Sequence, residues 1–146
     1  MKILITGGVG FIGSAVVRLA ISKGHQVINI DALTYAANLK SLSVIENNQN
    51  YFFEHADIRD RNALDKLFSK HIPDAVIHLA AETHVDRSID DPIDFVSTNI
   101  VGTANLLEAS RIYAAGKGPL GNFKFLHVST DEVYGSLPDN PSIKFT

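Results

Sequence analysis

The stretch Ile3-Leu4-Ile5-Thr6-Gly7-Gly8-Val9-Gly10-Phe11-Ile12-Gly13 decides the fold of this chain. A short apolar run meets a turn whose glycines are spaced Gly7-x-x-Gly10-x-x-Gly13, and an amphipathic helical pattern follows. Glycines in such a turn permit a positive φ, let a pyrophosphate approach the backbone and let the helix pack on the strand. The stretch predicts a strand–turn–helix unit whose helix N-terminus binds a dinucleotide. The alternative is a glycine-rich turn without a ligand.

Apolar runs and helical patterns alternate along the rest of the chain. The runs are short and nearly continuous, as expected for strands buried on both faces: Ile3–Ile5, Val27–Ile30, Tyr51–Phe53, Ala75–Leu79 and Phe123–Val128. Apolar residues at helical spacing separate them, and the longest helix is predicted to begin at Pro92 and to break at Gly116. This alternation predicts an α/β fold, a Rossmann-like doubly wound parallel sheet of about five strands with helices on both faces.

Composition limits the class of protein. The 146 residues favour one domain, which we expect over residues 1–135, with 136–146 as a loop. A formal net charge of −3 argues against nucleic acid or an anionic membrane as the main partner. The chain has no cysteine and no apolar run of the ~20 residues that a membrane span needs. A cytoplasmic protein is predicted.

Acidic and small residues follow the predicted strands. Asp31 ends the second strand, 18 residues after Gly13, near the interval expected for an acid that binds the adenosine ribose. A carboxylate there would repel a 2′-phosphate, so the sequence favours NAD over NADP. Asp57 follows the third strand, where a helix cap is an equally good interpretation. The small residues Ala80 and Ala81 suit a backbone lying against a cofactor, or simple close packing.

The fifth strand leads into Ser129-Thr130-Asp131-Glu132-Val133-Tyr134-Gly135. Ligands of open α/β sheets bind beyond the carboxyl ends of the strands. Two neighbouring acids there can divide the work of acid–base catalysis, one protonated and one ionised. Because successive side chains of a strand point to opposite faces, both acids can reach one substrate only if the chain turns at Thr130. The alternative is that Asp131 and Glu132 cap a helical turn.

At these residues the chain resembles the extended short-chain dehydrogenase/reductases, over all 146 residues but only about the first half of a typical member. The resemblance implies NAD as cofactor. It implies these cofactor-binding positions: Gly7, Gly10, Phe11, Ile12, Gly13, Asp31, Ala32, Leu33, Thr34, Asp57, Ile58, Leu79, Ala80, Ala81 and Thr98. The lone histidine of the fourth strand, His78, is interpreted as a core residue.

Two further tracts, Asp31–Ala36 and His84-Val85-Asp86-Arg87-Ser88, resemble those of dTDP-glucose 4,6-dehydratases within that group. The resemblance implies dehydration of dTDP-glucose to the 4-keto-6-deoxy sugar, a lyase reaction of deoxysugar and polysaccharide biosynthesis. It implies that Glu132 removes the C5 proton, that Asp131 protonates the leaving C6 hydroxyl, and that Thr130 and Thr83 contact substrate. No metal site is expected.

One expected part is missing. This superfamily oxidises substrate with a Tyr-x-x-x-Lys pair after the fifth strand, yet no tyrosine follows Tyr134. Tyr113-Ala-Ala-Gly-Lys117 has the spacing but precedes that strand, so we interpret it as a helix C-terminus. The expectation is a truncated, inactive chain that lacks the C-terminal substrate-binding lobe. The helix from Asp91 to Ala115 resembles one that forms half the dimer bundle of the family, which implies a homodimer for the full-length protein.

Two other functions stay open. One is a stand-alone NAD-binding module without catalysis. The other is a fragment of a related sugar-nucleotide epimerase, although the strand-five motif of those enzymes usually lacks the Asp131-Glu132 pair.

Overall fold

A single parallel sheet organises the chain. The structure, a computed structural model, describes residues 1–84, 92–116 and 122–135, with only the backbone at 131 and 132. The strands lie in the order β3-β2-β1-β4-β5, and every neighbouring pair is parallel. Their bounds are β1 Lys2–Thr6, β2 Gln26–Asp31, β3 Tyr51–His55, β4 Ala75–His78 and β5 Lys124–His127. The predicted Rossmann-like sheet is confirmed, with strand ends shifted by one or two residues.

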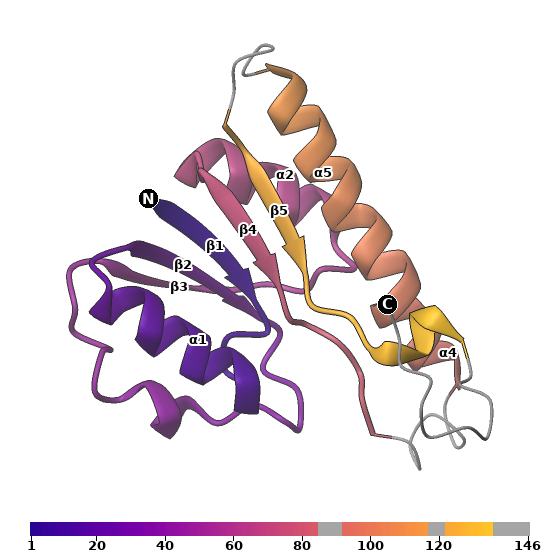
Figure 1. Cartoon of the computed structure of the whole chain (residues 1–146), viewed down its shortest axis with the longest axis horizontal. Helices are drawn as coiled ribbons and strands as arrows, with labels where there is room; N and C mark the ends of the chain where they lie inside the picture. Colours follow the sequence, from indigo (N-terminus) through magenta and orange to yellow (C-terminus); the bar gives the residue numbers. More distant parts are fainter. Residues whose placement is uncertain (85–91, 117–121, 136–146) are drawn as a thin grey trace, which may run out of the picture.

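Helices cover both faces of the sheet. Helix α1 lies on one face, and α2 and α5 lie on the other (Figure 1). The helical bounds are α1 Phe11–Ser22, α2 Arg61–His71, α4 Pro92–Val96 and α5 Thr103–Gly116. Short 3-10 turns lie at η1 Leu39–Leu42 and η3 Asp131–Tyr134. Because the strand order reverses beside β1, the carboxyl ends of β1 and β4 flank the switch point, where ligands of such sheets bind.

Two apolar cores result from alternation along the strands. Ile3 and Ile5 face α1, whereas Leu4 between them faces α2 and α5. Burial on both faces explains why the strands are continuous apolar runs rather than alternating patterns. The strands of greatest burial, β1 and β2, therefore hold the glycine turn and Asp31 on a rigid support.

The long predicted helix is continuous but not uniformly α-helical. Between α4 and α5, the six residues Ser97–Gly102 form a π-helix, η2. A β-carbon on Gly102 would lie 2.7 Å from the Ile58 side chain, so this segment packs closely on the β3–α2 connection. Single π-turns inside helices are often found at functional sites, because the wider turn displaces side chains from regular spacing.

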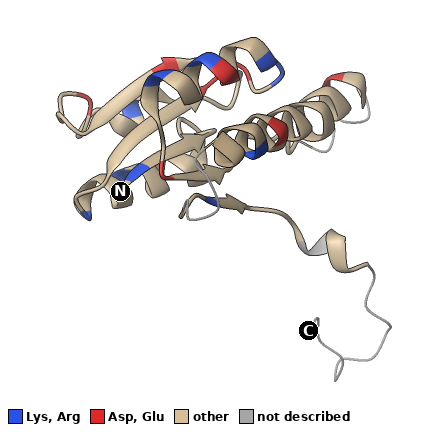
Figure 2. Ribbon diagram, turned by 90° about the horizontal axis from the view of Figure 1, so that it is seen from above, with Lys and Arg blue, Asp and Glu red and all other residues tan. Residues whose placement is uncertain are grey.

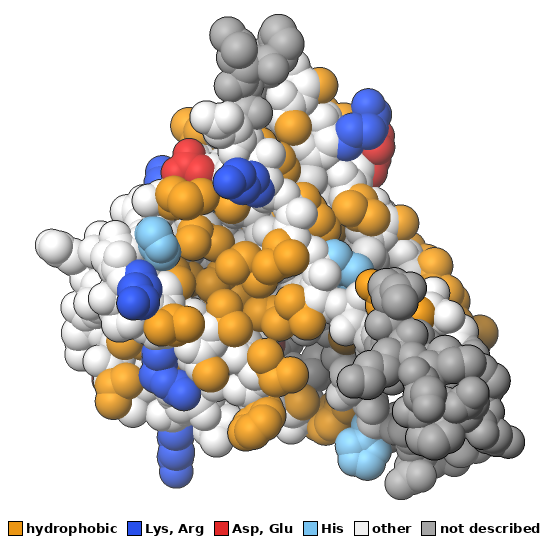
Figure 3. Space-filling view, viewed as in Figure 1, with side chains coloured by type: hydrophobic (Ala, Val, Ile, Leu, Met, Phe, Trp, Pro, Cys, Tyr) orange, Lys and Arg blue, Asp and Glu red, His pale blue; other side chains and the backbone are white. Residues whose placement is uncertain are grey.

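The sheet is only partly covered on the α1 face. Phe125 packs in the core with α2 and α5, so Leu126 faces the α1 side, where 55% of its surface is exposed. Apolar side chains gather over the centre of this face in the space-filling view (Figure 3). Strand β5 is the edge of the described sheet. Apolar side chains beside an open strand edge favour association with another surface.

Charged residues of both signs are interspersed over the helices, while the strands carry few (Figure 2). This arrangement agrees with a small net charge of −3. In the described part of the chain, no helix has the length and apolar character that crossing a bilayer would require.

Candidate functional site

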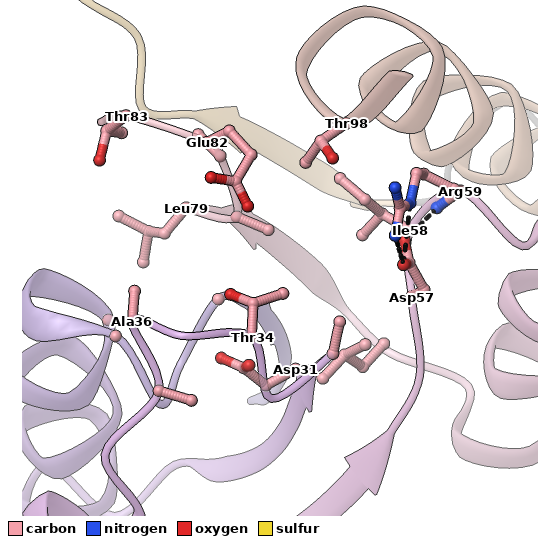
Figure 4. Close-up of a pocket in the computed structure, with 18 of the residues that line it drawn as sticks. Asp31, Thr34, Ala36, Asp57, Ile58, Arg59, Leu79, Glu82, Thr83 and Thr98 are labelled. Atoms are coloured by element: carbon pink, nitrogen blue, oxygen red, sulfur yellow. Dashed lines mark hydrogen bonds and ion pairs between the residues drawn. The ribbon is translucent and has the colours of Figure 1, made fainter. Parts of the chain in front are cut away.

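A cleft of about 360 Å³ opens at the carboxyl ends of β1, β2 and β4 (Figure 4). Its size lies within the range of small-molecule sites, roughly 300–1,000 Å³. It is lined by Gly7, Gly10, Phe11, Ile12, Gly13, Ile30, Asp31, Ala32, Thr34, Ala36, Ala37, Ala56, Asp57, Ile58, Arg59, Leu79, Ala80, Ala81, Glu82, Thr83, Asp94 and Thr98. Every predicted cofactor position except Leu33 belongs to this set.

The glycine turn forms one wall through its backbone. The Gly10 N–H donates to the Gly7 carbonyl at 3.2 Å, and α1 begins directly afterwards. A β-carbon on Gly13 would overlap that same carbonyl, so the helix can start this close to β1 only with glycine there. No side chain caps the N-terminus of α1. Its first N–H groups are therefore available to an anion, and the helix dipole favours negative charge at this end.

Asp31 holds two loops at the end of β2. One carboxylate oxygen accepts the N–H of Val9 at 2.9 Å, and the other accepts the N–H of Leu33, also at 2.9 Å. A carboxylate has about four lone-pair sites, so each oxygen keeps capacity for a hydroxyl donor from the cleft. Leu33 has a positive φ of 55° and its side chain packs against the α1 core. The side chain of Leu33 therefore does not line the cleft, and a cofactor contact of this residue stays a prediction.

The opposite wall carries an ion-pair cluster. Arg59 pairs with Asp57 at 2.7 Å through one nitrogen and with Asp94 of α4 through another. Burial would raise the pKa of Asp57, but hydrogen bonds from the side chain and backbone of Arg59, with its positive charge, lower it overall. The cluster ties the end of β3 to α4. Asp57 is thus an ionised acceptor at the cleft, and it does not act as the N-cap of α2, a role that Asp60 performs.

Residues after β4 form the floor and rim. Two hydrogen bonds of 2.8 Å join Asn99 of η2 to the backbone of Glu82. The Glu82 N–H donates to the Asn99 side-chain oxygen, and the Asn99 amide nitrogen donates to the Glu82 carbonyl. The Tyr35 hydroxyl donates to the Glu82 carboxylate at 3.1 Å across the mouth of the cleft. Thr83 and Thr98 lie at the rim from opposite sides (Figure 4). Sequence reasoning missed Arg59, Glu82 and Asp94, which contribute through contacts distant in sequence.

The predicted catalytic tract lies apart from the cleft. The chain leaves β5 after His127 and turns into η3 at Asp131, which agrees with a turn near Thr130. Thr130 is exposed and is not among the residues that line the cleft. The two views show η3 projecting from the sheet, overlapping α4 only in the first (Figures 1 and 2). The side chains of Asp131 and Glu132, like Asp86, Arg87 and Ser88, lie outside the described residues.

Tyr113 and His78, both considered from the sequence pattern, have structural roles. The Tyr113 hydroxyl donates to the Pro73 carbonyl at 2.9 Å, and its ring packs on Phe68 and Phe123 at the opposite end of the strands from the cleft. Lys117 lies outside the described residues. His78 is fully buried in the strand, as a core histidine should be. Among the residues the structure describes, no three acidic, histidine or cysteine side chains are placed to bind a metal ion.

The cleft fits a dinucleotide. Backbone N–H groups at a helix start would meet its pyrophosphate, and a carboxylate at the next strand end would meet its ribose hydroxyls. The glycine cradle is so close that added β-carbons would fill it. Fold and cleft thus define a Rossmann-type nucleotide-binding α/β domain.

Comparison with known proteins narrows this class. The profile of the GDP-mannose 4,6 dehydratase family matches residues 4–145, and the chain belongs to that family. The chain is 61% identical over 141 residues to a dTDP-glucose 4,6-dehydratase of Escherichia coli, covering 94% of this chain and 39% of that enzyme. The chain thus spans about 40% of the length of the curated relatives it matches.

Solved structures of related enzymes have the same fold. A Bacillus anthracis dTDP-glucose 4,6-dehydratase in complex with NAD superposes with a TM-score of 0.80 at 35% identity, covering 99% of this chain and 42% of the other. A Thermus thermophilus UDP-glucose 4-epimerase in complex with NAD gives a TM-score of 0.80 at 31% identity, covering 99% and 42%. The fold is therefore common to both activities.

Proposed function

We propose that this chain is the NAD-binding part of a dTDP-glucose 4,6-dehydratase. The observation that carries the proposal is the cleft. Residues that the family resemblance implies to bind the cofactor come from five separate segments and line one cavity at the switch point of the sheet. The 61% identity to a named dehydratase favours this reaction over epimerisation, because the epimerases among the similar solved structures are 31% to 41% identical.

Each wall of the cleft has a place in cofactor binding. The turn Gly7–Gly13 and the start of α1 would bind the pyrophosphate, and Asp31 would accept the adenosine ribose hydroxyls. Asp57 and Ile58 would border the adenine, while Ala80, Ala81 and Thr98 would lie along the nicotinamide half. Asp31 would disfavour the 2′-phosphate of NADP, because two negative charges would meet in a partly buried site.

The chemistry divides between the cofactor and the turn after β5. Bound NAD would supply the hydride chemistry, as acceptor from sugar C4 and donor to C6. Glu132 would take the C5 proton, which the 4-keto group has made acidic, and Asp131 would donate a proton to the leaving C6 hydroxyl. Asp131 must stay protonated near neutral pH, which a neighbouring carboxylate favours. Thr130 would hydrogen-bond the C4 oxygen, and Thr83 would contact the sugar.

The exposed face of the long helix supports a homodimer for the whole enzyme. Apolar residues recur along the side of α4, η2 and α5 that faces away from the sheet: Ile93, Val96, Ile100, Leu107 and Ile112, all 43% exposed or more. An apolar stripe of this length on a helix commonly packs on another helix. We place the enzyme in the cytoplasm, in deoxysugar synthesis for surface polysaccharide.

The experiment titrates the 146-residue chain with NAD⁺ and NADP⁺ by calorimetry and assays it with dTDP-glucose. Binding of NAD⁺ in preference to NADP⁺, without formation of the 4-keto-6-deoxy sugar, is expected. Failure to bind either dinucleotide would contradict the assignment of the cleft. Robust turnover would contradict our inference that this chain alone is inactive.

In an active longer protein, exchange of Asp131 and Glu132 for their amides abolishes dehydration; unchanged activity would favour an epimerase.

A further inference from the structure

A buried polar chain runs behind the cleft. The Thr6 hydroxyl lies 2.7 Å from Nδ1 of His78, and Nε2 of the same imidazole lies 3.0 Å from the Thr103 hydroxyl. Thr6 and His78 are both fully buried and lie opposite each other in the β1–β4 register. Thr103 is the first residue of α5, directly after the π-helix that carries Thr98 and Asn99. The imidazole of His78 therefore connects β1, the strand before the glycine turn, with α5.

The hydrogen bonds around Thr6 determine which imidazole nitrogen carries the proton. The Thr6 hydroxyl oxygen accepts the N–H of Ala80 at 3.3 Å. It also accepts the N–H of Leu79 at 3.3 Å, which is shared with the Thr6 carbonyl oxygen at 3.2 Å. A hydroxyl has two lone pairs and one hydrogen, so both lone pairs are used and the hydrogen needs an acceptor. Nδ1 of His78 is the group positioned to accept it. His78 therefore has the proton on Nε2, which donates to Thr103.

A protonated His78 would break this pattern. Its Nδ1–H would point at a hydroxyl that already accepts two N–H groups, and the Thr6 hydrogen would lose its acceptor. Burial, with a smaller contribution from the stacked imidazole of His127, lowers the pKa of His78 to about 4. The neutral form thus agrees with both the hydrogen bonds and the surroundings.

The Thr6 hydroxyl controls a close approach at the floor of the cleft. It receives the N–H of Ala80, whose backbone lies so near Gly7 that a β-carbon on Gly7 would be 2.7 Å from the Ala80 Cα. Ala80 and Gly7 both line the cleft. Rotation of the hydroxyl away from Ala80 would leave a partly buried N–H without this partner at the point where the dinucleotide would rest on the backbone.

We propose that His78, as the neutral Nε2–H tautomer between Thr6 and Thr103, is a positioning residue of the dinucleotide site. It fixes the Thr6 hydroxyl so that this group holds the Ala80 backbone against the glycine turn. The role toward the ligand rests on the proposed function, whereas the tautomer and the Ala80 contact do not.

A matched pair of amides separates this role from simple packing. In His78→Asn, the side-chain oxygen can occupy the place of Nδ1 and accept the Thr6 hydrogen. In His78→Gln, the longer side chain places its amide near Nε2, where it meets Thr103 and leaves Thr6 without an acceptor. Both replace a buried ring by a smaller amide, so a purely structural role would make the two variants similar.

The expected result is that His78→Asn binds NAD⁺ within about threefold of the original chain, while His78→Gln loses about tenfold, the value of one hydrogen bond. Thr6→Val should lower the NAD⁺ affinity by a similar factor, whereas Thr6→Ser, which keeps the hydroxyl, should retain it. The double variant His78→Gln with Thr6→Val should bind NAD⁺ no more weakly than Thr6→Val alone. Equal NAD⁺ affinities of the Asn and Gln variants would overturn the proposal.

A readout without ligand keeps the test independent of NAD binding and of variants that fail to fold. ¹⁵N NMR of the imidazole in the original chain at neutral pH should show Nε2 protonated and Nδ1 unprotonated. Amide hydrogen exchange at Ala80 should be slow, and in a folded His78→Gln it should be at least tenfold faster. A proton on Nδ1, or unchanged exchange at Ala80, would refute the role of His78. Failure of NAD⁺ binding together with the expected NMR result would instead refute the proposed function.

Discussion

Gly7 and Ala80 approach each other so closely that a β-carbon on Gly7 would stand 2.7 Å from both the Cα and the N of Ala80. Gly7 also has a positive φ of 70°. We therefore predict that Gly7→Ala lowers the free energy of unfolding by about 2–4 kcal/mol and removes NAD⁺ binding. Backbone strain contributes roughly 1–2 kcal/mol and the clash with Ala80 the remainder. Urea unfolding and calorimetry measure the two effects.

Gly24→Ala is the matched control for this change. Gly24 has a positive φ of 78°, but a β-carbon there would meet nothing within 4 Å. Gly24→Ala should lower the free energy of unfolding only by the backbone strain, roughly 1–2 kcal/mol, and leave the NAD⁺ affinity unchanged. If both alanine substitutions lower the free energy of unfolding equally, the contact with Ala80 does not contribute to the destabilisation by Gly7→Ala.

The carboxylate of Asp31 should decide which dinucleotide binds. Asp31→Asn retains an oxygen for one of the two N–H groups of Val9 and Leu33, but removes the charge. We expect NAD⁺ affinity to fall about tenfold, while NADP⁺ affinity falls less or rises, because the repulsion of its 2′-phosphate is gone. Competitive titration of the two dinucleotides measures the ratio.

Asp60→Asn serves as the control for Asp31→Asn. Asp60 caps α2 by accepting the N–H of Ala63 at 3.0 Å, and asparagine is an equally good N-cap. The discrimination between NAD⁺ and NADP⁺ should not change in this variant. An unchanged ratio in Asp31→Asn as well would show that the acid after β2 does not select the cofactor.

Sequence patterns were sufficient for the sheet, the glycine turn and Asp31 because these depend on local signals, whereas most other residues of the cleft were implied by the family resemblance. Continuous apolar runs such as Val27–Ile30 mark strands buried on two faces, and the glycine spacing marks the turn. The strand ends differ by one or two residues. The ladders of β1 to β3 continue past the apolar runs, as at Glu54 and His55 of β3, whereas β4 and β5 end within theirs.

The other features of the site depend on contacts between residues far apart in sequence, which no local pattern predicts. The π-helix forms where Gly102 meets Ile58 and Asn99 meets the backbone of Glu82, residues far apart in sequence. Arg59 reaches the cleft wall through its pair with Asp94, 35 positions away. His78 could be predicted as buried, but not that it bonds both Thr6 and Thr103.

The apolar face of α4, η2 and α5 should mediate self-association. Ile100, 63% exposed, lies at its centre in η2. We predict that the 146-residue chain forms dimers at tens of micromolar, and that Ile100→Glu is monomeric, since a charge would be buried without a partner. Sedimentation velocity measures the state. Val44→Glu, at an 80% exposed position outside this face, should leave the dimer intact; dimers in both variants would exclude this face.

The neutral, buried imidazole of His78 should make the protein sensitive to mild acid. Its pKa is lowered to about 4 from an ordinary value of 6.5, by burial first and by His127 second. Because the unfolded chain binds this proton more readily than the folded one, the stabilisation is complete above pH 6.5. It declines as the pH falls from 6.5 to 4, in total by on the order of 3 kcal/mol.

The carboxylates titrate in a different window, which makes this prediction separable. The pKa of Asp57 is lowered by Arg59, and that of Glu54 by hydrogen bonds from Lys70 and His71, each against the effect of burial. Their stabilisation is present above the ordinary carboxyl pKa of about 4 and is lost below it. Urea unfolding between pH 7 and 4.5 therefore isolates the histidine. His78→Asn should flatten the pH dependence in that interval, and an equally steep loss of stability in His78→Asn would show that another group is responsible.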